Sequence, residues 1–221
     1  MNKSHSFLIV DALQYNNWSE SVFKQINDGG VSAIHVTICY HEDFHEMIKN
    51  VICWNRFFDQ YSNLIFQGFS SDDILKAKKE GRTAIFFGFQ NCSPIESDIG
   101  LVEICYRLGV RLMQLSYNNQ SLLATGCYEN DDPGITRMGR QVIKEMNRLG
   151  MVVDMSHSAS RSTLEAIKIS ERPIAITHAN PSFWYDAKRN KSNEILISLG
   201  KSGGMLGFSM YPHHLKNKSE C

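Results

Sequence analysis

His157 and His178 are the residues of this sequence best placed to do chemistry, because each ends a short apolar run and one predicted helix separates the two runs. Adjacent parallel strands lie ~4.8 Å apart, so side chains at the ends of two neighbouring strands can reach one ion. Neutral imidazole is a common zinc ligand, and hydrolytic zinc sites keep one position open for water. The pair therefore predicts a metal site. The alternative is a hydrogen-bonded pocket or core position for either ring.

Three further polar residues stand where predicted strands run or end. Asp154 lies in the same run as His157, and Gln90 and Tyr117 each end a run of their own. A carboxylate at such a position can act as a general base, or it can accept structural hydrogen bonds. The sequence leaves both roles open for Asp154.

The other histidines indicate surface positions. His213 and His214 are expected to cap a surface loop. His41 and His45 have the i,i+4 spacing of a metal-binding helix, but the glutamate pattern of a zinc-protease helix is absent. We therefore expect these two rings on a solvated face.

Short β-branched or aromatic runs alternate with longer amphipathic segments along the sequence. The predicted strands cover residues 7–13, 32–40, 83–90, 110–117, 151–157, 173–178 and 204–211. The predicted helices cover residues 18–27, 43–61, 72–79, 100–108, 136–149 and 193–199, with one more opened by a capping box at Ser162-x-x-Glu165. Strand starts average roughly 30 residues apart, which is the spacing of successive βα units in a parallel sheet.

Two architectures have this alternation, a doubly wound open sheet and a (β/α)8 barrel. The open sheet usually has a glycine-rich first turn, and the first turn here, residues 11–17, contains no glycine. We therefore expect a TIM-like α/β barrel that forms a single domain over residues 1–221. Only about seven βα units can be counted, and such a barrel normally needs ~250 residues. The sequence thus predicts an incomplete (β/α)8 barrel without its last strand and helix, a fragment of a longer polypeptide.

The composition indicates a soluble globular protein. The 221 residues include 23 basic and 23 acidic side chains, so the basic excess typical of nucleic-acid binders is missing. No apolar run approaches the ~20 residues of a membrane span, and the N-terminus does not have the pattern of a signal peptide. The six cysteines are scattered without a Cys-x-x-Cys pair, as expected for reduced, mostly buried thiols. We expect a cytoplasmic protein without a nucleic-acid or membrane partner.

Two histidine motifs and an Arg-Asn pair resemble a known family. The stretch EMNRLGMVVDMSH over residues 145–157 resembles the strand-five signature of the membrane (renal) dipeptidase family of zinc metallopeptidases. PIAITHANP over residues 173–181 and then Arg189-Asn190 continue the similarity in the same order. QLSYNNQS over residues 114–121 is similar to the strand-four motif of bacterial members.

The resemblance implies a (β/α)8 barrel that binds two zinc ions and hydrolyses dipeptides, including ones with a D-residue on the C-terminal side. Carried over by position, His157 and His178 are the two histidine ligands of one zinc ion. Arg189 matches the arginine that holds the substrate carboxylate, a task that suits a guanidinium. Asn190 and Tyr117 are the further substrate-binding candidates, and a homodimer is compatible with the resemblance.

Several metal-ligand positions depart from the family pattern. The first strand should end in His-x-Asp, but the aligned residues are Leu13 and Tyr15, and the bridging glutamate falls on Gln90. The aspartate of the eighth strand lies beyond Cys221. Two dications ~3.5 Å apart repel by about 19 kcal/mol at an effective dielectric constant of 20, and neutral residues do not offset that repulsion. We therefore expect one zinc ion rather than two.

The sequence thus predicts a dipeptidase-like metallohydrolase that cleaves a dipeptide or similar small amide by metal-activated water. His157 and His178 would hold the metal and Arg189 the substrate carboxylate. Gln90, as a weak ligand or a hydrogen-bond donor near the scissile carbonyl, and Asp154 are the catalytic candidates. The alternative is a catalytically impaired relative that binds an amino-acid or amide ligand, which the replaced ligand positions favour.

Overall fold

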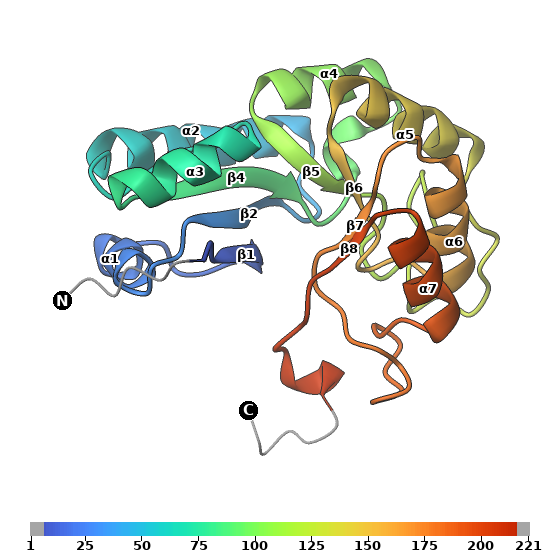
Figure 1. The fold of residues 1–221 in the computed structure, drawn as a ribbon. Helices are drawn as coiled ribbons and strands as arrows, with labels where there is room; N and C mark the ends of the chain where they lie inside the picture. Colours follow the sequence, from blue (N-terminus) through green and yellow to red (C-terminus); the bar gives the residue numbers. More distant parts are fainter. Residues whose placement is uncertain (1–6, 216–221) are drawn as a thin grey trace.

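One curled parallel sheet carries the described part of the chain, residues 7–215 of a computed structural model. Its strands follow in the order β1 (Val10–Gln14), β2 (Ala33–Cys39), β4 (Thr83–Phe89), β5 (Val110–Gln114), β6 (Val152–Asp154), β7 (Ala175–Ile176) and β8 (Met205–Leu206). The connecting helices are α1 (Glu20–Asp28), α2 (Phe44–Gln60), α3 (Ser71–Glu80), α4 (Gly100–Arg107), α5 (Arg137–Leu149), α6 (Ser160–Ile169) and α7 (Asn193–Lys201). Figure 1 shows α4, α5, α6 and α7 following one another along the outside of the curl.

This arrangement confirms the predicted α/β fold, an incomplete TIM-like barrel, and each predicted run overlaps one strand of the path. Strand β3 (Ile65–Gln67) was not predicted, because it is too short to show a hydrophobic period of its own. It pairs with the first half of β4, from Thr83 to Ile85, whereas β5 pairs with the second half, from Phe87 to Phe89. The two short pairings together cover one side of β4.

The strands near the predicted histidines end earlier than the hydrophobic pattern predicts. β6 ends at Asp154, and His157 follows in the loop. The Asp154 carboxylate accepts hydrogen bonds from the backbone N–H groups of Ser156 and Thr177, at 3.0 and 3.2 Å. Because side-chain bonds of this kind compete with ladder bonds, the regular pairing stops and the chain turns into the loop.

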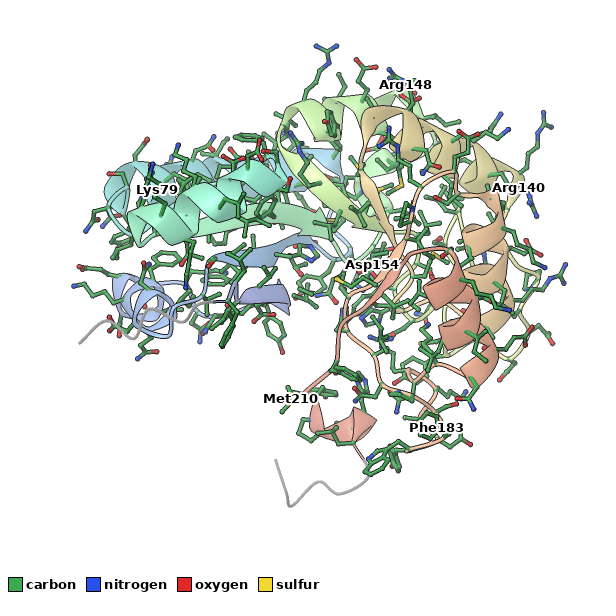
Figure 2. All side chains as sticks on the ribbon, viewed as in Figure 1. Lys79, Arg140, Arg148, Asp154, Phe183 and Met210 are labelled. Carbon is green, nitrogen blue, oxygen red and sulfur yellow. The ribbon has the colours of Figure 1, made fainter. Side chains whose placement is uncertain are left out.

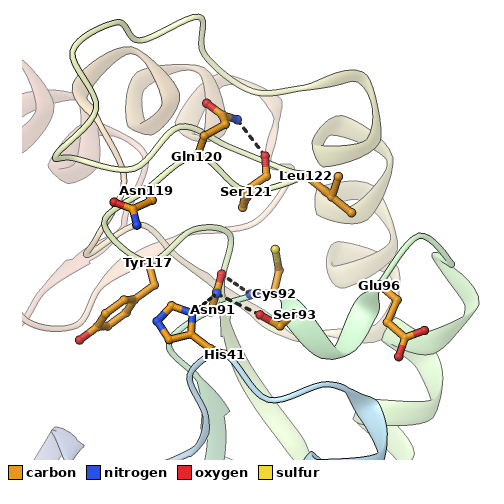
Figure 3. A pocket seen from close by; sticks show the side chains of 10 residues that line it. All are labelled: His41, Asn91, Cys92, Ser93, Glu96, Tyr117, Asn119, Gln120, Ser121 and Leu122. Atoms are coloured by element: carbon orange, nitrogen blue, oxygen red, sulfur yellow. Dashed lines mark hydrogen bonds between the residues drawn. The ribbon is translucent and has the colours of Figure 1, made fainter.

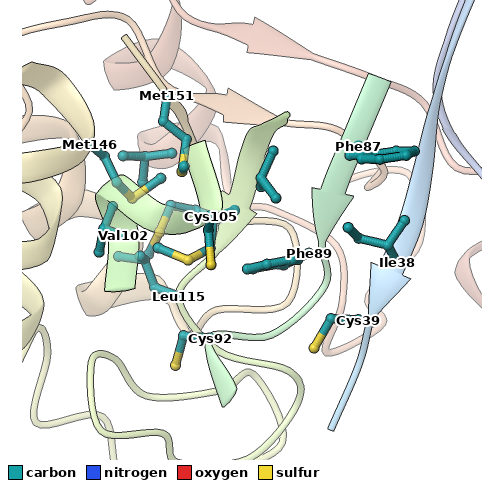
Figure 4. Close-up of a cluster of buried hydrophobic side chains, with 14 of the residues drawn as sticks. Ile38, Cys39, Phe87, Phe89, Cys92, Val102, Cys105, Leu115, Met146 and Met151 are labelled. Atoms are coloured by element: carbon teal, nitrogen blue, oxygen red, sulfur yellow. The ribbon is translucent and has the colours of Figure 1, made fainter. Parts of the chain in front are cut away.

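The main hydrophobic core lies between the sheet and the outer helices. Alternate residues of the central strands point into it, such as Ile34 and Val36 of β2. Figure 4 shows Cys39, Cys92 and Cys105 among these buried apolar side chains. The described cysteines form no disulfide, and Cys53 is exposed. Burial raises the pKa of the Cys92 thiol to about 11, so these buried thiols are inert.

A buried histidine on the opposite face of the sheet requires glycine on the neighbouring strand. His35 of β2 is 4% exposed, and its Nδ1 bonds the backbone oxygen of Ala12 at 2.7 Å. A Cβ atom at Gly88 of β4 would lie 1.9 Å from the His35 Nε2 atom. The ring therefore crosses β4 only because Gly88 has no side chain, and it anchors β1 to β2.

The start of α6 differs from the prediction. The capping box predicted at Ser162 and Glu165 is wrong, because the helix begins at Ser160 and Ser162 lies inside it. The carboxylate of Asp132 accepts hydrogen bonds from the N–H groups of Arg161 and Ser162, at 2.6 and 3.3 Å. A side chain thirty residues upstream thus satisfies the first turn, and a local motif cannot reveal such a cap.

Candidate active site

The side chains predicted to do chemistry gather in one cavity of about 770 Å³ at the carboxyl ends of the strands. His157 and His178 line it from the loops after β6 and β7. Gln90 and Tyr117 line it from the loops after β4 and β5, and Arg189 lines it from further along the loop after β7. Because parallel strands end on the same side of the sheet, residues far apart in the sequence meet here.

The two histidines face each other through the same ring atom. The Nε2 atom of His157 lies 2.9 Å from the Nε2 atom of His178. The His157 Nδ1 atom lies 2.7 Å from the side-chain oxygen of Asn118, and the His178 Nδ1 atom lies 2.8 Å from the Thr177 hydroxyl oxygen. An amide oxygen only accepts, so His157 carries its hydrogen on Nδ1. The Thr177 hydroxyl donates to Asp154 at 2.6 Å, so it accepts from His178 Nδ1.

In this arrangement both Nε2 lone pairs point into the same small space. Two facing lone pairs at 2.9 Å repel unless a cation lies between them. Burial lowers the pKa of His178 to about 3, against the raising effect of Asp154. Burial and then the charge of Arg189 also hold the pKa of His157 well below its usual range. Both rings are therefore neutral near pH 7, which is the protonation state that a metal ligand needs.

The loop after β5 fixes the plane of the His157 ring. The Tyr117 ring stacks on His157, with centroids 4.2 Å apart and an interplanar angle of 23°. Asn118, which bonds the same imidazole, has a left-handed backbone with φ 63°. A Cβ at Gly126 would lie 2.1 Å from the Asn118 carbonyl carbon, so the two loop segments approach closely only at this glycine. The sequence analysis did not single out Asn118.

Asp154 lies behind the cavity wall and is fully occupied by structural bonds. It is 0% exposed and accepts five hydrogen bonds, from the Gln114 amide and from the backbone and hydroxyl groups of Ser156 and Thr177. Burial alone would raise the pKa of Asp154, but its interactions with His178 and these donors outweigh burial and lower it. Figure 2 shows this residue near the centre of the molecule. Its geometry favours a structural role, since Thr177 joins it to His178.

Replacing Asp154 by alanine is expected to destabilise the fold by about 3 kcal/mol or more, because several buried donors lose their partner at once. Urea unfolding at pH 7 measures this free energy. Glu194→Ala, a substitution of an exposed carboxylate in the first turn of α7, is the matched control. Equal unfolding free energies for the two variants would contradict the structural role.

Two buried cations lie beside the histidines. The Arg189 guanidinium is 2% exposed and donates to the backbone oxygens of Ser156 and of His178, the latter at 3.1 Å. Lys191 is also 2% exposed, and its Nζ donates to the Ser158 oxygen at 2.7 Å. Within the described residues, neither cation forms an ion pair with a carboxylate. Both clamp the loops that hold His157 and His178, and the sequence analysis missed Lys191.

Asn190 organises the loop instead of lining the cavity. Its side-chain oxygen accepts from the Asn180 N–H at 3.1 Å. Its amide donates to the backbone oxygens of Tyr185 and His214, at 2.8 and 3.0 Å. The predicted surface position of His214 is wrong, because this residue is 8% exposed and lines the cavity, whereas its neighbour His213 is exposed. The sequence His213-His214 alone does not show which of the two rings is buried.

The residues that replace family metal ligands form another wall of the cavity. Leu13 and Tyr15 line it from β1 and the residues that follow, together with Asp11, the one carboxylate in this lining. Gln90 is 3% exposed, and its amide donates to the Thr37 hydroxyl at 2.9 Å. This wall is therefore neutral or apolar at the positions where the family pattern has charged ligands.

A second cavity of about 570 Å³ adjoins the first and shares Tyr117 with it (Figure 3). His41, exposed as predicted, lies at its edge with its ring centroid 5.4 Å from that of Tyr117. Asn91 bonds His41 and Ser93, at 3.2 and 3.0 Å. The hydroxyl of Ser121 bonds backbone groups of its own loop. Many polar groups that line this second cavity are thus already hydrogen-bonded within the protein.

His157 and His178 are the metal-ligand candidates among the described residues. Between residues 7 and 215, no three His, Cys, Asp or Glu side chains are close enough together to hold a single ion. His157 and His178 nevertheless present two oriented, neutral nitrogen donors, each held at its other ring nitrogen by a side-chain oxygen, which is the usual support of a metal-binding imidazole. The described residues thus offer two imidazole donors that fit the coordination chemistry of a metal ion.

A curled parallel sheet with its polar cavity at the strand ends is the arrangement of a TIM-like barrel fold. Residues 14–221 match the model of a family described as membrane dipeptidase (peptidase family M19), so this chain belongs to that family. The family resemblance noted in the sequence is therefore confirmed. None of the helices in the described region has the length and apolar character that crossing a bilayer requires.

Known relatives and structures agree with this membership. The chain is 24% identical over 176 residues to the dipeptidase tcpJ of Claviceps purpurea, and 26% identical over 167 residues to the dipeptidase verJ of Clonostachys rogersoniana. These matches cover 78% and 75% of this chain but only 41% and 43% of the relatives. The chain thus spans about two fifths of the length of these curated relatives.

Among solved structures, an amidohydrolase from Pseudomonas aeruginosa is 37% identical with a TM-score of 0.89, over 91% of this chain and 62% of that one. A metallo peptidase from Rhodobacter sphaeroides, liganded with a phosphinate mimic of the dipeptide L-Ala-D-Ala, is 14% identical with a TM-score of 0.84. The match covers 92% of this chain and 74% of the Rhodobacter protein. At 14% identity the likeness concerns the fold alone.

Proposed function

We propose that the chain is a dipeptidase-like metallohydrolase that cleaves a dipeptide or a similar small amide. The observation that carries the proposal is the pair of neutral imidazoles whose Nε2 atoms face each other at 2.9 Å at the mouth of the sheet. Membership of a dipeptidase family supports the same reaction. The apposed lone pairs are the arrangement that a bound cation would stabilise.

The cation proposed for this position is one zinc ion held by His157 and His178. Zinc prefers imidazole nitrogen, and when bound it supplies an activated water for attack on a carbonyl. The protein residues keep both rings aligned, through Asn118 on one side and through Thr177 and Asp154 on the other. Burial lowers the pKa of both rings and so keeps them neutral. Asp154 therefore acts on the reaction by positioning His178.

The remaining predicted residues are proposed to bind or position the substrate. Arg189 has N–H groups left over from its two backbone bonds, and these are proposed to bind the substrate carboxylate. Gln90 is held near the cavity wall by Thr37 and is proposed as a weak ligand or a hydrogen-bond donor near the scissile carbonyl. Tyr117 is proposed to contact the substrate, and Asn190 supports the loop that carries Arg189.

A hydrolysis screen of dipeptides, L-Ala-D-Ala among them, with added zinc, cobalt or manganese tests the proposal. The expected result is turnover that a chelator abolishes and that added zinc restores, because the proposed reaction depends on water activated by the cation that His157 and His178 would hold. The reaction is followed by the released free amino acid. The double variant His157→Ala with His178→Ala is expected to be inactive with every metal.

The neutral wall made by Leu13, Tyr15 and Gln90 favours a second candidate, a catalytically impaired relative that binds an amino-acid or amide ligand. Ligand binding by calorimetry without any turnover, in the presence of each metal, would support this candidate and reject the hydrolase.

A further inference from the structure

His214 lies on the cavity wall in a fixed relation to Arg189. It ends the short 3-10 turn Pro212–His214 beyond β8, is 8% exposed, and lines the same cavity as Arg189. Its backbone oxygen accepts hydrogen bonds from the side-chain amides of Asn180 and Asn190, at 3.2 and 3.0 Å. Because Asn190 directly follows Arg189, these bonds tie the two cavity-lining side chains to one loop.

The hydrogen bonds of Ser209 decide which nitrogen of His214 carries the hydrogen. The Ser209 hydroxyl oxygen accepts the Tyr211 N–H at 3.3 Å and lies 2.8 Å from the His214 Nδ1 atom. Donation to Nδ1 is the arrangement that gives the hydroxyl hydrogen a partner among the described residues. We therefore assign to His214 the tautomer with its own hydrogen on Nε2. This tautomer is opposite to that of His157 and His178.

The Nε2–H group of His214 has no partner among the described residues, and it belongs to a side chain that lines the cavity. Arg189 uses two of its five N–H groups on backbone oxygens and forms no ion pair there. Lys191 adds a second buried amino group on the same loop, which is positive below about pH 7 because burial lowers its pKa to about 7. The surroundings of Arg189 thus combine positive charge with unused donors, which is the chemistry that recognises an anion.

The protonation state of His214 is compatible with this role. Burial, and then the charges of Arg189 and His213, lower the pKa of His214 to about 4. The ring is therefore neutral near pH 7 and can lie near a guanidinium without repelling it. A neutral Nε2–H still donates a hydrogen bond to a carboxylate.

We propose that the Nε2–H of His214 and the guanidinium of Arg189 together bind the carboxylate of the substrate. The inference rests on the proposed function and narrows its substrate to compounds with a free carboxylate. It gives His214 a binding role, separate from the imidazole pair that is proposed to hold the metal. Amidated substrates are expected to bind weakly, because an amide has no negative charge to share between the two donors.

Steady-state kinetics of the 221-residue chain with zinc, on L-Ala-D-Ala and on its C-terminal amide, tests this inference. His214→Leu removes the donor and is expected to raise KM for the free dipeptide about 10-fold or more, with kcat changed less than twofold. KM for the amide should stay the same. His214→Gln keeps an N–H donor and should recover most of the loss, and His213→Ala, at the exposed neighbour, should behave as wild type.

Zinc content and ligand binding separate failure of this inference from failure of the proposed function. A fall of kcat at constant KM in His214→Leu, or loss of zinc, would overturn the binding role. If the wild type does not turn over, calorimetry with D-alanine and D-alaninamide is decisive. Preference for D-alanine that His214→Leu removes supports the inference although hydrolysis fails, and no preference in the wild type overturns it.

Discussion

Replacing His178 by alanine is expected to lower the affinity of the chain for zinc by at least about 100-fold. The substitution removes one of two nitrogen donors that are already oriented at 2.9 Å from each other. Loss of a direct donor should exceed the 10–100-fold loss that is typical when a supporting hydrogen-bond partner is removed. The affinity is measured by competition with a chromophoric chelator, and bound zinc by mass spectrometry after dialysis.

Two further variants compare how much other residues contribute to the affinity for zinc. Asn118→Ala leaves both imidazoles in place but removes the acceptor of the His157 Nδ1 hydrogen, so a smaller loss of about 10–100-fold is expected. His213→Ala changes an exposed ring and should leave zinc binding unaltered. Equal, near-zero zinc in the wild type and in the His157→Ala, His178→Ala double variant would end the metal assignment.

Lys191→Met is expected to stabilise the fold in a manner that depends strongly on pH. Burial, and then the charge of Arg189, lower the pKa of Lys191 from 10.5 to about 7. Below about pH 7 this lysine is protonated in both states, and the folded state bears the whole cost of the buried charge, about 5 kcal/mol at 1.36 kcal/mol per pKa unit. As the pH rises from about 7 toward 10.5, this cost disappears, because the unfolded lysine loses its proton as well.

The expected measurement is urea unfolding of the wild type and the variant at pH 6 and at pH 9.5. The hydrogen bond from Nζ to the Ser158 oxygen is lost at both values, at a cost of about 1 kcal/mol. The gain from Lys191→Met should therefore be about 4 kcal/mol at pH 6 and about 3 kcal/mol smaller at pH 9.5. Lys144→Met, at an exposed position of α5, supplies the control. A gain that does not change with pH would contradict the buried charge.

The parts of this fold that could be predicted from sequence are those with a local signal. The parallel strands and the helices each show a hydrophobic period, and His157 and His178 stand just beyond two apolar runs. Helix α3 was predicted over residues 72–79, and in the structure it begins after an N-cap at Ser70 and ends at Gly81 in the left-handed conformation.

The parts that escaped prediction depend on contacts between distant segments. Asp132 caps helix α6 from about thirty residues away, so the local Ser162 motif predicted the wrong start for this helix. His214 is buried because amides from the loop after β7 bond its backbone, and nothing in the His213-His214 doublet shows which ring turns inward. The burial of Lys191 likewise follows from the position of the Ser158 loop.

The distance between the two facing nitrogens also fixes a stoichiometry. At 2.9 Å the lone pairs of His157 and His178 can share one positive charge, and there is no room for a second. A proton and the proposed metal ion would therefore compete one for one for the same place. Because burial lowers the pKa of His178 to about 3, only strong acid supplies the competing proton, and metal uptake near pH 7 is expected to release none from the pair.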